Sequence, residues 1–175
     1  ARFFVSTHME PNRPWSAVDA PYLDIELQRT LTFPDRWRHP MGSGGESYVH
    51  VPLRTISELK RFRPDVVISA ELGARTALAV VHCAKRRIPL VIWVDVSESS
   101  ELGRGALRRA LRRALLRTNT AIAVNGMSGM RYVARLGVDP SRICAVPLPL
   151  EEPFIETQAP VRTEHRCRKL LYCGR

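Results

Sequence analysis

The second half of the chain alternates short apolar runs with stretches of helical pattern, and this alternation restricts the folds that it can adopt. Three runs rich in β-branched residues, DVVISA, PLVIWVD and AIAVN, occupy residues 65–70, 89–95 and 121–125. Strands that are apolar throughout and alternate with helices are typical of a parallel sheet covered on both faces. The sequence therefore predicts an α/β fold, a Rossmann-like parallel sheet flanked by helices.

Helical stretches separate these strands. They are expected at residues 73–87, 103–118 and 128–137, and a fourth strand is expected at 142–147. The first helix carries basic residues in its last turn, where they complement the helix dipole. Gly137 follows the third helix at the position where a left-handed backbone ends a helix.

The chain before residue 65 has a weaker pattern. Two strands are expected at residues 2–6 and 48–52, and two helices at 23–30 and 55–62. Thr55 and Glu58 have the spacing of a capping box, which predicts Thr55 as the N-cap of the second helix. The chain begins and ends within strand-like segments, so we expect it to be a piece of a longer protein.

The composition fits one compact domain and does not decide which class of molecule the protein binds. The chain has 175 residues, 45% of them apolar, and a formal net charge of +10 that comes mostly from arginine. Such a charge permits contact with nucleic acid or an anionic membrane without establishing either. The four cysteines have no metal-ligand spacing, no metal site is predicted, and no apolar run approaches the roughly 18 residues of a spanning helix. These features predict a cytoplasmic protein, with a peripheral position on the inner face of the plasma membrane left open.

The stretch GRGALRRALRRALLRT, residues 103–118, raises the question of a partner most directly. At helical spacing its alanines and leucines gather on one side and its arginines on the other. Nucleic acid phosphates, an anionic membrane surface, or water around a helix packed on a core would each suit this pattern. The candidate membrane-surface residues are Arg104, Arg108, Arg109, Arg112, Arg113 and Arg117.

Polar and small residues gather where three of the predicted strands end, at residues 69–75, 95–101 and 125–129. Ligands of open parallel sheets bind beyond the carboxyl ends of the strands, near helix N-termini. The candidate catalytic residues are the acids Glu98 and Asp95. The candidate binding residues for a sugar or a phosphate are Glu71, Gly73, Arg75, Ser97, Asn125, Gly126 and Ser128.

These residues also have structural interpretations. Glu71 and Arg75, four apart at a helix start, can form an ion pair, and Glu98 can be a solvated acid. A turn and a helix N-cap would account for Asn125, Gly126 and Ser128. The chain has no GxGxxG after a strand, no GxxxxGKS/T, no HExxH and no CxxC, so nucleotide hydrolysis, dinucleotide redox chemistry and structural zinc lose their strongest signals.

Residues 61–147, which include RPDVV, the basic helix after the central strand, and VNGMSGMRYVARLGVDPSRICAVP, resemble the N-terminal half of family 4 glycosyltransferases of the GT-B fold. The order of these segments carries the resemblance. The closing LLYCGR is similar to the strand that begins the second, donor-binding domain of such enzymes.

This resemblance implies a retaining glycosyltransferase of the hexosyltransferase type. Residues 1–150 would form its Rossmann-like acceptor-side domain, without the first strand and the glycine-rich loop. Residues 151–168 would be the interdomain linker and 169–175 the first strand of the donor-binding domain. The seven candidate binding residues would then bind the acceptor, and this piece would be inactive alone.

Two departures from the family pattern limit what carries over. Many members have a histidine just after the central strand, where this chain has Asp95, so a histidine's role does not transfer. Ser97 and Glu98 are the other polar residues at that place. VPLPLEEPF also stands where PNGVD is common.

The resemblance implies the partners as well. A nucleotide-sugar donor would bind as co-substrate through the C-terminal domain, the acceptor would be a glycan or a lipid-linked molecule, and no cofactor is expected. In membrane-associated relatives a basic helix similar to residues 103–118 lies against anionic lipid. Nucleic acid is not expected, because this helix has no aromatic residue to stack on bases. A non-catalytic Rossmann-like binding domain and a basic nucleic-acid-binding module remain the alternatives.

Overall fold

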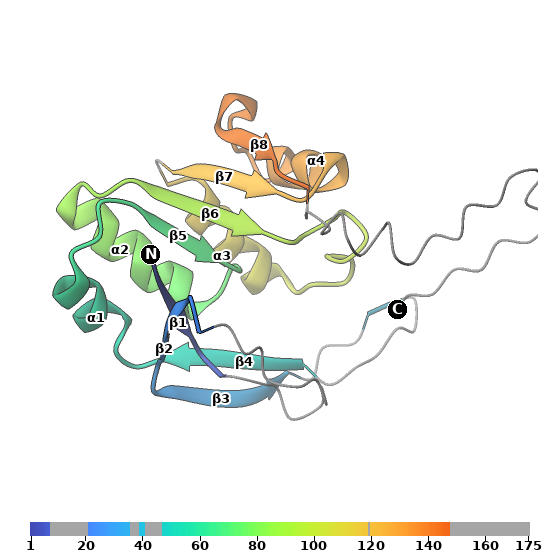
Figure 1. Cartoon of the computed structure of the whole chain (residues 1–175). Helices are drawn as coiled ribbons and strands as arrows, with labels where there is room; N and C mark the ends of the chain where they lie inside the picture. Colours follow the sequence, from blue (N-terminus) through green and yellow to red (C-terminus); the bar gives the residue numbers. More distant parts are fainter. Residues whose placement is uncertain (8–20, 36–38, 41–46, 119, 148–175) are drawn as a thin grey trace, which may run out of the picture.

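Four parallel strands form the main sheet of the computed structural model, which describes residues 1–7, 21–35, 39–40, 47–118 and 120–147 (Figure 1). They are β5 (Val67–Ala70), β6 (Leu90–Val94), β7 (Ala121–Val124) and β8 (Ile143–Ala145), and they lie side by side in that order. All three pairings are parallel. The predicted α/β fold with a parallel sheet is confirmed.

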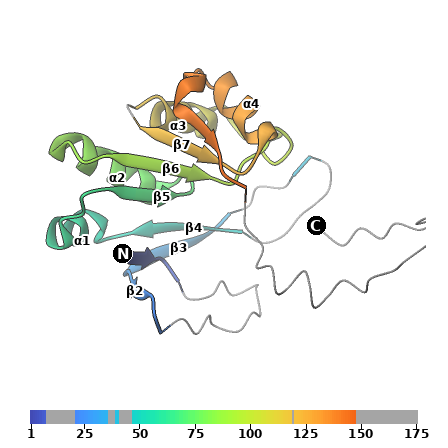
Figure 2. The same ribbon diagram turned by 45° about the horizontal axis from the view of Figure 1, so that its top comes forward.

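Three helices connect these strands and lie on one face of the sheet (Figures 1 and 2). α2 (Ala74–Arg86) follows β5, α3 (Ala106–Leu116) follows β6, and α4 (Met127–Arg135) follows β7. Crossovers between parallel strands are almost always right-handed. Here each crossover moves the chain one strand further in the same direction, so the three helices fall on the same side.

The core lies between this face and the helices. Ile92 and Val94 of β6 are at most 1% exposed and point to the helical side. They belong to one buried cluster with Cys83 of α2, Leu116 of α3 and Val133 of α4. Burying an aliphatic side chain of this size contributes about 1.5–3 kcal/mol, so this cluster is a main source of stability.

The opposite face of the sheet is only partly covered by the described residues. Ile68 is 64% exposed there, Val91 and Trp93 are half-buried, and Cys144 is exposed. The sequence predicted cover on both faces, and within the described part of the chain α2, α3 and α4 supply it on one. The strand order is the reason, because crossovers that all advance in one direction cannot reach the second face.

Two strand pairs and a helix precede this sheet. β1 (Arg2–Val5) pairs in parallel with β2 (Asp24–Leu27), and β3 (Thr30–Asp35) pairs antiparallel with β4 (Ser47–Pro52). α1 (Thr55–Phe62) leads into β5, and both α1 and β4 contact α2. The strands expected at residues 2–6 and 48–52 and the helix expected at 55–62 are confirmed.

The helix expected at residues 23–30 is wrong, because this segment contains β2. Its sequence DIEL alternates acidic and apolar side chains, as strands do. Arg2 of β1 forms ion pairs with Asp24 at 2.9 Å and with Glu26 at 3.2 Å. Pairing with a distant strand therefore decides the structure of this short segment.

The capping box expected at Thr55 is also wrong. The N-cap of α1 is Arg54, and its side chain makes no capping hydrogen bond. Thr55 and Glu58 are instead buried, where the amide of Gln28 donates a hydrogen bond to Glu58 and lies 3.5 Å from the Thr55 hydroxyl. Tertiary contacts thus engage the two side chains that the local pattern assigned to the helix end.

The end of α4 agrees with the sequence. Gly137 has a left-handed backbone, with φ of 86°, as predicted. A 3₁₀ turn, Pro140–Arg142, whose N-cap Asp139 accepts a hydrogen bond from the Ser141 N–H, then leads into β8. The linker expected at residues 151–168 and the strand expected at 169–175 lie outside the described residues. In the part of the chain that is described, no helix has both the length and the apolar character needed to cross a membrane.

Candidate functional site

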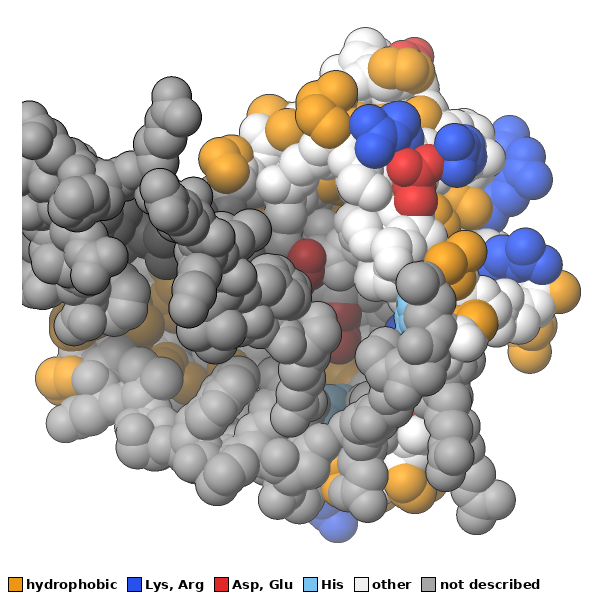
Figure 3. All heavy atoms as spheres, turned by 90° about the vertical axis from the view of Figure 1, so that its right-hand side faces the viewer, with side chains coloured by type: hydrophobic (Ala, Val, Ile, Leu, Met, Phe, Trp, Pro, Cys, Tyr) orange, Lys and Arg blue, Asp and Glu red, His pale blue; other side chains and the backbone are white. Residues whose placement is uncertain are grey.

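The predicted site residues lie along the edge of the sheet at which β5, β6 and β7 end. These strands are parallel, so their carboxyl ends share one edge. Figure 3 views the molecule from this side, and in its upper part an acidic side chain lies between basic ones. The predicted residues form one group after β6 and β7 and another after β5.

Asp95 and Asn125 meet at the ends of β6 and β7. Val94 and Val124 are register partners, so the residues that follow them stand opposite each other. The Nδ2 group of Asn125 donates a hydrogen bond to Asp95 Oδ1 at 2.7 Å. Asn125 Oδ1 in turn accepts one from Trp93 Nε1 at 3.1 Å. The structure therefore joins two predicted site residues and adds Trp93 to them.

Glu98, the second candidate acid, is held by α4. Arg131 Nε lies 3.0 Å from Glu98 Oε2, and Arg135 Nη1 lies 2.5 Å from Oε1. The Glu98 backbone N–H donates to the Ser128 hydroxyl at 3.2 Å. Glu98 is thus an ion-paired acid, and Ser128 holds the loop that carries it.

The loop after β6 is fixed by further short contacts. Ser97 and Ser100 exchange hydrogen bonds, since each backbone N–H donates to the other hydroxyl, at 2.9 and 3.0 Å. Gly129 of α4 packs directly against the loop, because a Cβ there would lie 2.8 Å from the Val96 carbonyl oxygen and 3.1 Å from Val124 Cβ. The absence of a side chain at Gly129 lets α4 come this close.

Two of the predicted glycines are N-cap residues. Gly73 precedes α2 and Gly126 precedes α4, and neither helix has a side-chain cap. The N-cap residues of both helices therefore supply no acceptor to the first backbone N–H groups, which point toward the carboxyl edge, and at α2 the Glu71 carboxylate lies beside the N-cap, with Oε1 3.6 Å from where a Cβ of Gly73 would be.

Glu71 and Arg75 lie at the end of β5. Glu71 has a left-handed backbone, with φ of 72°, which is uncommon for a residue other than glycine. Its N–H donates to the Trp93 carbonyl at 3.2 Å, and its own carbonyl accepts from Thr76 Oγ1 at 2.7 Å. Arg75 donates to the Ser6 hydroxyl. Burial lowers the pKa of Arg75 and the carboxylate of Glu71 opposes that effect, so a partly buried cation stands beside this strand end.

Three of the six candidate membrane-surface arginines turn into the protein. Arg108 and Arg104 lie 3.1 and 3.7 Å from Oδ2 of Asp35, at the end of β3. Arg112 forms an ion pair with Glu101, and these two residues are 9% and 8% exposed. Burial lowers the pKa of both Arg104 and Arg112. The arginines therefore do not share one solvated side of the helix.

The outer side of α3 combines leucines with arginines. Leu107 is 86% exposed and Leu111 is 47% exposed. The arginines exposed with them are Arg109, Arg113 and Arg117. The leucines that pack into the core are those of the last turn. The outer side of α3 is therefore both apolar and basic.

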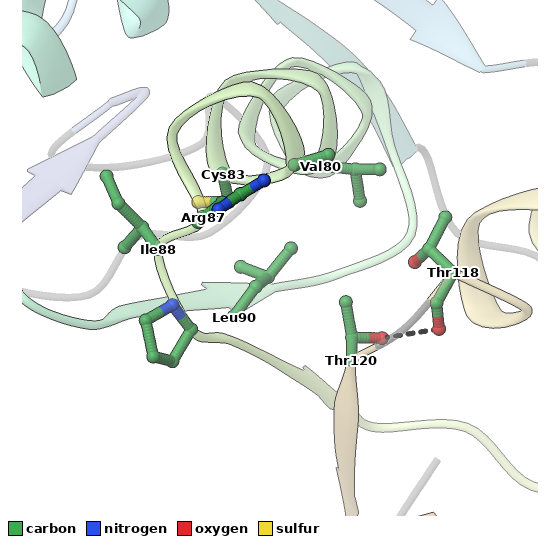
Figure 4. A pocket seen from close by; sticks show the side chains of 9 residues that line it. Val80, Cys83, Arg87, Ile88, Leu90, Thr118 and Thr120 are labelled. Atoms are coloured by element: carbon green, nitrogen blue, oxygen red, sulfur yellow. Dashed lines mark hydrogen bonds between the residues drawn. The ribbon is translucent and has the colours of Figure 1, made fainter.

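A cavity of about 470 Å³ lies at the other end of the sheet, where β6 and β7 begin (Figure 4). Its lining is mostly apolar and includes Val80, Cys83, Ile88, Leu90, Thr118 and Thr120. The described residues that line it include no acidic group that could orient a sugar hydroxyl, and the predicted catalytic and binding residues are all at the opposite edge. We therefore place the candidate site at the carboxyl edge. Within the described residues, His, Cys, Asp and Glu side chains do not gather into a metal-binding group.

The sequence interpretation missed Trp93, Arg131 and Arg135. A signal for Trp93 was available, because residues two apart on a strand share a face and Trp93 therefore points the same way as Asp95. Arg131 and Arg135 are four apart and share a helix face. Only the fold brings them to Glu98, which lies 33 residues before Arg131 in the chain.

Residues 4–149 match the family model of the glycosyl transferase 4-like domain. The matched range contains the whole main sheet and every predicted site residue. No curated protein matches the chain.

Proposed function

The chain belongs to the family of glycosyl transferase 4-like domains, and on this premise we propose that it is the acceptor-side domain of a retaining glycosyltransferase. The enzyme would transfer a hexose from a nucleotide-sugar donor to a glycan or lipid-linked acceptor. The observation that supports this best is the set of polar groups at the carboxyl edge, which includes a carboxylate at Asp95, an amide at Asn125 and a guanidinium at Arg75. Such groups can orient hydroxyl and phosphate oxygens.

The roles of these groups follow from their chemistry. Asp95 accepts hydrogen bonds from hydroxyl groups, whereas Arg75 and the N-terminus of α2, which Gly73 leaves without a side-chain cap, favour an anion such as a phosphate. Glu98 works through the loop, because its ion pairs with Arg131 and Arg135 hold that loop against α4.

The outer side of α3 supports a second part of the proposal, a peripheral position on an anionic membrane. Leu107 and Leu111 would enter the headgroup region, and the arginines beside them would meet anionic lipid. Each such arginine contributes on the order of 1 kcal/mol near an anionic surface. Because Arg104, Arg108 and Arg112 are engaged by Asp35 and Glu101, the lipid-facing set is restricted to Arg109, Arg113 and Arg117.

Sugar-nucleotide turnover by the full-length protein tests the transferase. Uridine, guanosine, adenosine and thymidine diphosphate sugars are offered in turn, and the anomeric configuration of the product is read by NMR. Turnover with retention is the expected result. Inversion would overturn the retaining mechanism, and no turnover with any donor would favour a non-catalytic binding domain.

Binding to liposomes of phosphatidylglycerol or phosphatidylcholine tests the membrane contact. The Arg109/Arg113/Arg117→Ser variant should bind phosphatidylglycerol vesicles on the order of a hundredfold more weakly, since about 3 kcal/mol is lost. A variant with Arg29, Arg54 and Lys60 changed to Ser lowers the net charge equally and should bind almost as wild type does.

A leucine variant completes this test. Leu107→Ser/Leu111→Ser should also weaken binding, while Val81→Ser, a control on α2 with 46% exposure, should not. Equal losses in the Arg109/Arg113/Arg117→Ser variant and in its charge-matched control would show that net charge alone drives the binding. Tighter binding to RNA than to either vesicle would instead favour the nucleic-acid alternative.

A further inference from the structure

Asp95 and Glu98 are the two acids just after β6, and their surroundings differ. Both carboxylate oxygens of Glu98 face arginines, Arg131 and Arg135. Asp95 is exposed and forms no ion pair with any described residue, and the hydrogen bond from Asn125 engages its Oδ1. Asp95 is therefore the acid with an oxygen, Oδ2, that no described residue engages by a hydrogen bond or an ion pair.

Two hydrogen bonds in series set the direction of the Asp95 carboxylate. An indole N–H can only donate, so the atom of Asn125 that meets Trp93 Nε1 at 3.1 Å is the carbonyl oxygen. This assignment turns Nδ2 of Asn125 toward Asp95, to which it donates at 2.7 Å. With the amide reversed, Asn125 Oδ1 would face the Asp95 carboxylate and Asn125 Nδ2–H would face the Trp93 N–H. Trp93 therefore selects the observed orientation.

The sheet brings these three residues to one face. Asp95 directly follows β6 and lies two residues after Trp93, and Asn125 lies opposite Asp95 because Val94 and Val124 before them are register partners. Trp93 and Asn125 are half-buried, whereas Asp95 is exposed. The two supporting groups are thus partly shielded from water, and the carboxylate that they hold is accessible.

We infer that Trp93 and Asn125 are positioning residues that aim the Asp95 carboxylate at a hydroxyl group of a sugar substrate. Asn125 holds Oδ1, and Oδ2 accepts the hydrogen bond from the hydroxyl. This inference rests on the proposed glycosyl transfer. The hydroxyl belongs either to the acceptor or to the sugar of the donor, which share this chemistry.

A double-mutant cycle in the full-length enzyme tests the positioning role. Asp95→Asn should lower kcat/KM roughly 10- to 100-fold, the usual effect of losing a hydrogen bond to a charged group. If Asn125 acts through Asp95, Asn125→Ala should lower kcat/KM by a similar or smaller factor. The kcat/KM of the double variant should then be no lower than that of Asp95→Asn alone. Losses that multiply would overturn the inference, because Asn125 would then act independently.

Conservative variants and a distant control complete the cycle. Trp93→Phe keeps a ring and removes the donor, and it should lower kcat/KM in the wild-type background but not beside Asp95→Asn. Ser141→Ala removes an exposed hydroxyl that bonds Asp139 and should leave kcat/KM unchanged. A Trp93→Phe loss that persists beside Asp95→Asn would show a merely structural role.

Two arms of the assay distinguish the sources of the hydroxyl. Donor hydrolysis is measured without acceptor, and transfer is measured at saturating donor with varied acceptor. If Asp95→Asn raises the acceptor KM or lowers transfer while hydrolysis stays unchanged, the hydroxyl belongs to the acceptor. If hydrolysis falls equally, it belongs to the donor. Unchanged kinetics in both arms would overturn the inference.

An NMR measurement on the 175-residue chain separates failure of this inference from failure of the proposed function. The Trp93 indole N–H, assigned with Trp93→Phe, should exchange with water more slowly in wild type and Asp95→Asn than in Asn125→Ala. Methyl α-D-mannopyranoside and methyl β-D-glucopyranoside are the probes. At least one should shift the Asn125 side-chain amide resonances in wild type and not in Asp95→Asn. No shift with either glycoside overturns the inference even if the enzyme is active. A shift without turnover overturns the transferase and leaves the hydroxyl site in place.

Discussion

Single residues control how closely the elements around the site approach one another. Gly129 has this role, because α4 meets the loop after β6 at a distance that leaves no room for a side chain. His82 has a different role, since it places a titratable ring in the interior at 4% exposure. Both effects are set by tertiary contacts rather than by the identity of the neighbouring residues in the chain.

Gly129→Ala should destabilise the protein by about 1–3 kcal/mol, because the new Cβ would collide with the Val96 carbonyl oxygen at 2.8 Å. Urea unfolding followed by circular dichroism measures the change. Gly105→Ala is the matched control, since no atom lies within 4 Å of its Cβ, and it should cost less than about 1 kcal/mol. Equal effects of the two substitutions would contradict this account.

His82 should make the protein less stable in mild acid. Burial lowers its pKa below the ordinary value of 6.5, and the charges of Arg86 and Lys60 lower it further. The unfolded chain therefore binds a proton more readily, so the free energy of unfolding should fall as the pH drops below about 6.5. In the His82→Gln variant, the difference between the free energies of unfolding at pH 7.5 and at pH 5.5 should be smaller than in wild type. An unchanged difference would assign the acid sensitivity to other groups.

At the scale of elements, α3 divides its arginines between two environments. Its inner side carries Arg108 and Arg112 against Asp35 and Glu101, and its outer side carries Leu107 with exposed arginines. A buried ion pair contributes little net stability, yet it strongly penalises the loss of one partner. The inner pairs thus fix the rotation of α3 and thereby determine which residues face outward.

Glu101→Gln should cost about 3–5 kcal/mol in the free energy of unfolding, because it leaves the Arg112 charge buried without its carboxylate. Replacing both residues, as Glu101→Leu with Arg112→Met, should recover most of this loss since no buried charge remains. Thermal and urea unfolding measure both variants. A double variant as unstable as Glu101→Gln would mean that the loop needs Glu101 for another contact, such as the one with Tyr132.

At the scale of the whole molecule, the hairpin of β3 and β4 is tied to the α/β part through Asp35 and His39. Asp35 pairs with Arg104 and Arg108, and His39 Nε2 lies 2.8 Å from the Ser99 carbonyl oxygen. These contacts join the N-terminal strands to the loop that carries the site. Substitutions in the hairpin should therefore alter the loop at the carboxyl edge of β6.

Asp35→Asn should loosen this connection. The ion pairs are only partly buried, so a loss on the order of 1 kcal/mol is expected, which corresponds to roughly fivefold faster amide hydrogen exchange in β3 and β4. Asp24→Asn, which breaks an ion pair between β2 and β1, is the control and should leave that exchange unchanged. Faster exchange throughout the molecule in Asp35→Asn would indicate global destabilisation instead.

The sequence by itself determined the α/β class, the order of the strands and helices after residue 65, and the edge where polar residues gather. These properties follow from local patterns, because runs of apolar β-branched residues and helical periodicity do not depend on distant partners. The strand at residues 24–27 was not decided in this way, because its alternation spans only four residues and its pairing with β1 comes from another part of the chain.

Only the tertiary structure decided which acid at the site is accessible and which arginines of α3 are exposed. Helical periodicity places Arg108 and Arg109 together, yet Asp35 engages one of them and leaves the other at the surface. The sequence alone likewise does not distinguish Asp95 from Glu98 as site acids. The fold distinguishes them, because α4 brings two arginines to Glu98 and the residue after β7, Asn125, meets Asp95. The physical reason is that charge and hydrogen-bonding groups are defined by partners in space, which local patterns do not contain.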